Sequence, residues 1–125
     1  MDLLEDDERF LKGKGYDFAL HAEGEGGCLI IKAYRLSPGK YDSDSSDLLI
    51  CMPKGYNNAK LDSFYLDPPV RLKATGQYPA AADVFEAHAG RNWQRFSRHL
   101  EQWRPGIDTL QNFMPLVQRE LQDKA

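Results

Sequence analysis

Three short runs of strand-favouring residues, separated by turn-forming residues, constrain the fold of this chain more than any other feature. Residues 16–22 alternate apolar and polar side chains, which is the period of a half-buried strand. Residues 28–36 and 47–52 are apolar runs bounded by glycine, serine and proline. The pattern predicts an antiparallel meander.

Helical periodicity appears on both sides of these runs. Apolar residues on one helical face predict a short amphipathic helix over residues 3–12, which ends at Gly13. After Gly106, apolar residues recur at steps of three and four, typical of one buried helical stripe. The stripe consists of Ile107, Leu110, Met114, Val117 and Leu121. Pro115 interrupts it, so we expect a kink or two short helices. Helices flanking an antiparallel meander predict an α+β fold with the helices on one face of the sheet.

Two consecutive prolines follow the meander, in the sequence DPPVRL at residues 67–72. Proline has no amide hydrogen, so neither Pro68 nor Pro69 can donate to a sheet ladder. We therefore expect them in a crossover, with a fourth strand beginning after them at Val70.

Length and composition exclude several classes of protein. The 125 residues suit one domain over 1–125, and the net charge of −3 argues against general nucleic-acid binding. No apolar run approaches the roughly 18 residues that span a bilayer, and the acidic start does not resemble a signal peptide, so we expect a cytoplasmic protein without a membrane partner. Cys28 and Cys51 lie in strand-like runs and are expected to be buried, inert thiols. Short metal-binding spacings of cysteine or histidine are absent, so no metal and no cofactor are expected.

The densest group of functional side chains lies between Gly90 and Gly106, where both tryptophans and four arginines occur. We expect this segment to be a partly buried loop or short helix. Ser97 and His99 are two residues apart, so both side chains project to the same side if the backbone is extended and diverge if it is helical. A serine hydroxyl needs an adjacent base to act as a nucleophile, and an extended segment would supply His99 as that base.

Several landmarks make the chain resemble the ubiquitin-conjugating (UBC) superfamily. PKGY at residues 53–56, DPPVRL at 67–72 and LEQWRP at 100–105 are similar to the turn after a strand, the proline crossover and the Trp-x-Pro of that fold. WQRFSRH at 93–99 looks more narrowly like its bacterial branch, prokaryotic family E. The resemblance covers essentially the whole chain. It implies a UBC-like fold with an N-terminal helix, a four-stranded antiparallel meander and a C-terminal helix.

The sequence departs from ordinary conjugating enzymes at two places. Their His-Pro-Asn tripeptide is YPA here, at residues 78–80, and the position of their cysteine, eight residues before Trp103, is Arg95. The departures therefore point away from an ordinary thioester. The chemistry of the 90–106 segment makes Ser97 the candidate acyl carrier, with His99 as its base. Arg95 and Asn92 are the predicted stabilisers of the oxyanion.

The resemblance also implies partners, because members of that branch are encoded with a ubiquitin-like protein, an activating enzyme and an isopeptidase. We expect the ubiquitin-like protein, the activating enzyme and target proteins as partners. Arg98, Trp93 and Trp103 are the predicted partner-binding residues. The main alternative is a UBC-like scaffold without catalysis, in which Ser97 is a turn hydroxyl and the arginines stack on the tryptophans. Acyl carriage on Cys28 or Cys51, and a single-stranded nucleic-acid platform, are less favoured.

Overall fold

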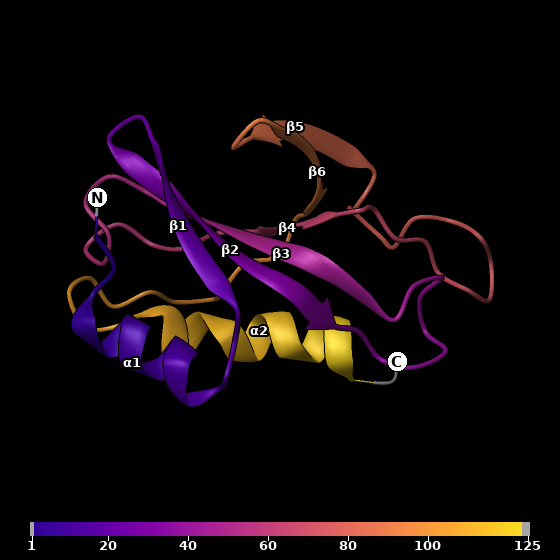
Figure 1. The fold of residues 1–125 in the computed structure, drawn as a ribbon, viewed down its shortest axis with the longest axis horizontal. Coiled ribbons are helices and arrows are strands. Elements are labelled where there is room, and N and C mark those ends of the chain that lie inside the picture. Colours follow the sequence, from indigo (N-terminus) through magenta and orange to yellow (C-terminus); the bar gives the residue numbers. More distant parts are fainter. Residues whose placement is uncertain (1, 124–125) are drawn as a thin grey trace.

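The computed structural model describes residues 2–123 and contains two helices and six strands. In chain order these are α1 (Glu5–Gly13), β1 (Phe18–Glu23), β2 (Gly26–Arg35), β3 (Ser45–Met52), β4 (Phe64–Asp67), β5 (Val84–His88), β6 (Arg91–Phe96) and α2 (Leu110–Gln122). The strands form one antiparallel sheet in the order β1-β2-β3-β4-β6-β5. Both helices cover one face of this sheet, and the β5–β6 hairpin arches over the opposite face (Figure 1). This is the predicted α+β, UBC-like architecture, with six strands instead of four.

Apolar clusters fill both faces of the sheet. On the helix side, the apolar stripe of α2 and Leu11 of α1 pack against inward-facing residues of the central strands. A smaller cluster on the opposite face lies where the β5–β6 hairpin arches over the sheet, and consists of Cys28, Ile30, Leu49, Tyr65 and Trp93. Each fully buried large side chain of this kind contributes about 1.5–3 kcal/mol, so both faces hold the strands in register.

The first three strands form the predicted meander, but the fourth strand was placed wrongly. It precedes the two prolines, as Phe64–Asp67, because Phe64, Tyr65 and Leu66 provide both a buried run and amide donors, which proline lacks. Residues 68–83 instead form the crossover. The prediction of a loop or short helix for 90–106 was wrong for its first part, which is β6 and pairs with β4 and β5 on its two sides. Residues 97–106 form the expected loop.

A tight turn makes the β5–β6 hairpin. Ala89 and Gly90 join the paired residues His88 and Arg91, and both have positive φ, 51° and 73°. Positive φ at both central residues gives a two-residue turn that matches the twist of the flanking strands. Glycine adopts positive φ without strain.

The last helix begins later than its apolar pattern predicts. Thr109 is the N-cap and makes a capping box with Asn112, so Asp108 precedes the helix and Ile107 is 64% exposed. Pro115 lies inside one continuous helix, so the prediction of two short helices was wrong. Because Pro115 has no amide hydrogen, the Gln111 carbonyl one turn earlier receives no helical hydrogen bond. Gln111 is exposed, so water can hydrate this carbonyl. Within residues 2–123, neither helix has the length and apolar character that crossing a membrane requires.

A buried carboxyl joins the two helices. Asp7 of α1 is fully buried and accepts hydrogen bonds from the Tyr56 hydroxyl (2.5 Å) and the Leu110 amide (3.3 Å) at the start of α2. Burial raises the pKa of Asp7 above its ordinary value of 3.8, and the two hydrogen bonds partly oppose this shift.

The raised pKa of Asp7 predicts how stability depends on pH. The folded protein holds this proton more tightly than the unfolded chain, so protonation of Asp7 stabilises the fold. That contribution is present below the unfolded pKa and is lost as the pH rises through the folded pKa. In Asp7→Asn, urea unfolding followed from pH 4 to pH 7 should therefore show a smaller decline in stability than the wild type. An equal decline in both proteins would contradict the assignment. Asp83→Asn, an exposed carboxylate that does not contribute to the Asp7 pKa, is the matched control.

Candidate functional site

Ser97, His99 and Asp62 form a hydrogen-bonded chain at the end of β6. Strand β6 ends at Phe96, and residues 97–99 form no helix. A non-helical backbone was the condition under which Ser97 and His99 were expected to pair. The Ser97 Oγ lies 3.3 Å from the His99 Nε2, and the His99 Nδ1 bonds the Asp62 carboxylate. We call these three residues the serine triad.

Backbone pairing beyond the strand ends places the triad. Phe64 of β4 is opposite Phe96 of β6, and their rings stack with centroids 4.9 Å apart. The Ser63 amide donates to the Arg98 carbonyl at 2.9 Å, which continues this pairing past the named strands. Asp62 is therefore carried across to the segment that holds Ser97 and His99.

The order of contacts in the triad suits nucleophilic chemistry. A carboxylate beside Nδ1 favours the imidazole tautomer with its proton on Nδ1, which leaves Nε2 free to accept the proton of the serine hydroxyl. The side chains of His99 and Asp62 are 53% and 37% exposed, so a macromolecular substrate can reach them. The Ser97 amide, however, donates to the Ala81 carbonyl at 3.1 Å and is not free to stabilise an oxyanion.

The structure does not bring the predicted oxyanion stabilisers to Ser97. The Arg95 guanidinium lies beside Glu86 of β5, with Nη1 3.3 Å from Oε2, and its Nε is buried without a hydrogen-bond partner. Asn92 is exposed and lies five residues before Ser97 along β6, a distance of roughly 16 Å in an extended strand. Both residues belong to the hairpin and not to the triad.

The predicted partner-binding residues make contacts inside the protein. The Arg98 guanidinium bonds Glu120 of α2 and the Ser97 carbonyl, so Arg98 is the one of the three beside the triad. Trp93 is fully buried and its ring offers no surface to a partner. Trp103 is partly buried, and its indole N–H donates to the Asn57 carbonyl at 2.9 Å.

Comparison with family models decides the family. The model described as prokaryotic E2 family E matches residues 3–124, essentially the whole chain. The chain belongs to this family. It is a UBC-like protein, as its helix, antiparallel sheet and final helix also indicate. No curated protein and no solved structure gave a match.

The cysteines of this family E protein are poorly suited to carry an acyl group. Cys28 is fully buried and Cys51 largely so, on the sheet face opposite the helices. Burial is the main cause that raises the pKa of Cys28 to about 12 and that of Cys51 to about 11. The thiolate is the nucleophilic form of cysteine, so little of either side chain is reactive near neutral pH.

Sequence reasoning missed one member of the serine triad. The two-residue spacing of Ser97 and His99 indicated their pairing, but Asp62 lies 37 residues from His99 in the sequence. Only the β4–β6 register, with Phe64 opposite Phe96, indicates that Asp62 meets His99.

Proposed function

We propose that this protein is an acyl carrier in a bacterial ubiquitin-like protein conjugation pathway. It receives the C-terminal acyl group of a ubiquitin-like protein from an activating enzyme and passes it to amines of target proteins. The observation that carries this proposal is the hydrogen-bonded and partly exposed Ser97–His99–Asp62 chain of a family E protein. Partnership with a ubiquitin-like protein and an activating enzyme follows from the family in general.

The proposed reaction has two acyl transfers. In the first, the Ser97 Oγ attacks the carbonyl carbon of the thioester on the activating enzyme, His99 Nε2 takes the hydroxyl proton, and the carbon–sulfur bond breaks to release a thiolate. His99 passes its proton to the thiolate that leaves. In the second transfer, a target amine attacks the carbonyl carbon of the Ser97 oxyester and loses a proton to His99 Nε2, the carbon–oxygen bond breaks, and His99 returns that proton to the Ser97 oxygen. An amide remains on the target, and Ser97 returns to its starting state.

A non-catalytic scaffold is the alternative, and one observation favours it. The Ser97 amide is engaged with the Ala81 carbonyl, and neither Arg95 nor Asn92 reaches Ser97. Oxyanion stabilisation, which is usually the largest single term in acyl transfer, must then come from the partner or from a backbone shift. A scaffold would bind the ubiquitin-like protein or the activating enzyme without a covalent bond.

Intact-mass spectrometry separates these functions. The protein is incubated with the activating enzyme, the ubiquitin-like protein and ATP, next to Ser97→Ala, a Cys28→Ala/Cys51→Ala variant and Ser43→Ala as an exposed-serine control. We expect an adduct that resists thiol reductants, is cleaved by hydroxylamine, and is lost only in Ser97→Ala. A reductant-sensitive adduct lost in the cysteine variant would instead establish a thioester. Complex formation without any adduct would establish the scaffold.

A further inference from the structure

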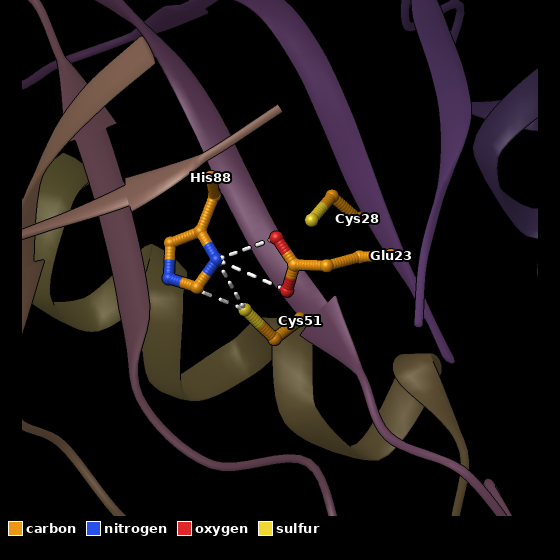
Figure 2. Close-up of side chains that lie close together, drawn as sticks. All are labelled: Glu23, Cys28, Cys51 and His88. Carbon is orange, nitrogen blue, oxygen red and sulfur yellow. Dashed lines mark hydrogen bonds and ion pairs between the residues drawn. The ribbon is translucent and has the colours of Figure 1, made fainter. Parts of the chain in front are cut away.

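Four potential metal ligands converge on the sheet face away from the helices and from the serine triad. They are Glu23, Cys28, Cys51 and His88, which we call the Cys/His cluster. One ligand atom of each lies within 4.8 Å of all the others. Figure 2 shows the His88 ring directed toward Glu23 and Cys51, with Cys28 beside them. We propose that the Cys/His cluster binds one divalent metal ion of the zinc class, which fastens the β5–β6 hairpin to the first three strands.

The four ligands come from four different strands. Cys28 of β2 is directly opposite Cys51 of β3, so the two thiols are cross-strand neighbours on one face. Glu23 ends β1, and His88 ends β5. The terminal strands β1 and β5 are the farthest apart in sheet order, yet the arch of the hairpin brings their ends together (Figure 1).

The separations are close to those of a tetrahedral zinc site. Zinc bonds of about 2.3 Å to sulfur and about 2.0–2.1 Å to nitrogen place ligand atoms about 3.4–3.8 Å apart. Here the His88 Nδ1 lies 2.8 Å from the nearer Glu23 oxygen and 4.0 Å from the Cys51 sulfur. Small side-chain rotations are enough to surround an ion. Two thiolates, an imidazole and a carboxylate form a donor set that favours Zn²⁺ over Mg²⁺ or Ca²⁺.

The surroundings of His88 orient its Nδ1 toward the cluster. The Cys51 sulfur lies 4.0 Å from both ring nitrogens, and the contact with Glu23 is made by Nδ1. Nε2 lies 3.2 Å from the Glu86 carboxylate, which also accepts the Tyr65 hydroxyl at 3.2 Å and an Arg95 N–H at 3.3 Å. A neutral imidazole has one N–H and cannot donate to both Glu23 and Glu86. With Nε2–H given to Glu86, Nδ1 is a lone-pair donor. This is the carboxylate–histidine–metal arrangement of many zinc sites.

Charge and access are consistent with an ion at this place. Without a metal both thiols keep their protons, and a bound cation would offset the charge of the two thiolates and the carboxylate that coordinate it. The thiols must lose their protons when the metal binds, so binding should release up to two protons and weaken as the pH falls. The Glu23 side chain is 41% exposed and that of His88 is 13% exposed, which leaves an entry route from the solvent.

No local sequence motif indicates this site, because its ligands are spread over residues 23–88 without short spacing. The prediction of no metal depended on local motifs of the Cys-x-x-Cys type. The sheet curvature, and not the sequence spacing, brings these ligands together.

Metal titration of the reduced full chain tests the proposal. Treatment with a chelator first removes any bound metal. The wild type should then bind one Zn²⁺ per chain, as measured by competition with a chromophoric chelator. It should also give thiolate-to-metal absorption and tetrahedral d–d bands with Co²⁺. Zn²⁺ should raise the Tm. Cys51→Ser and His88→Gln each remove a ligand and should weaken Zn²⁺ binding by more than about 100-fold. Glu86→Gln removes only the carboxylate that contacts His88, so it should weaken binding by about 10–100-fold.

Matched variants separate the cluster from general surface binding. Glu25→Gln, in the same β1–β2 hairpin and paired with Lys54, and Glu101→Gln, an exposed carboxylate outside the cluster, should bind Zn²⁺ like the wild type. The Co²⁺ spectrum of the wild type needs no variant, so misfolding of a mutant does not weaken the test. Absence of the Co²⁺ thiolate bands, or equal Zn²⁺ affinity in Cys51→Ser, would overturn the proposal. So would a Cys28–Cys51 disulfide that persists under reductant.

Discussion

In His99→Ala, the rate of Ser97 adduct formation should fall by about 10²–10⁴-fold, the usual contribution of a positioned general base. The hydroxyl of Ser97 is a weak nucleophile, and His99 Nε2, 3.3 Å away, is the acceptor that the structure places beside it. The His99 side chain is 53% exposed, so its removal should cost little folding stability. The loss should therefore appear in the rate and not in binding of the activating enzyme.

Asp62→Asn tests the third member of the triad separately. An asparagine can still contact the imidazole, but it removes the negative charge that stabilises the imidazolium formed when His99 takes the proton. We expect a slower single-turnover rate than in the wild type, with unchanged complex formation. Asp44→Asn, an exposed carboxylate outside the triad, is the matched control. Wild-type rates in both His99→Ala and Asp62→Asn would remove the triad from the mechanism and favour the scaffold.

Local patterns predicted the parts of the fold that local interactions determine. The alternation in 16–22 and the apolar runs at 28–36 and 47–52 became β1, β2 and β3, and the helical stripes became α1 and α2. Strand β6 could not be predicted in this way. Its sequence RNWQRF is mostly polar, and it is a strand because β4 and β5 pair with it on both sides.

Local sequence patterns are also insufficient to predict all of the serine triad and the Cys/His cluster. Ser97 and His99 could be paired from their spacing once an extended backbone was assumed. Asp62 and the Cys/His cluster depend on strand register and on the arch of the hairpin, which are contacts between distant segments. Arg95 and Asn92 were assigned to the site because they are near Ser97 in sequence. An extended strand places Asn92, five residues away, far from Ser97 and on the opposite face. Arg95, two residues away, is instead held by Glu86 of β5.

Gln94→Leu should destabilise the fold by about 3 kcal/mol or more. Gln94 is fully buried in β6, and its amide makes three hydrogen bonds to the crossover between β4 and β5. Its Oε1 accepts from the Val70 amide at 2.8 Å, and its Nε2 donates to the carbonyls of Val70 and Ala82, each at 2.9 Å. Leucine has a similar size, so it fills the space but leaves three buried backbone groups without partners. Each such group costs about 1–3 kcal/mol.

The consequence of Gln94→Leu should extend to the serine triad. The crossover that Gln94 holds includes Ala81, whose carbonyl accepts the Ser97 amide at 3.1 Å. Loosening the crossover frees that amide and removes one of the contacts that position Ser97. Urea unfolding measures the stability loss, with Gln111→Leu on the exposed face of α2 as the control. Gln94→Glu keeps an acceptor for the Val70 amide but buries a carboxyl group against the carbonyls of Val70 and Ala82. It should therefore destabilise at least as much as Gln94→Leu at neutral pH, and less at low pH, where the carboxyl is protonated. If Gln94→Leu lost less than about 1 kcal/mol, the crossover would have to be held by the packing of Val70 and Ala82 and not by the Gln94 amide.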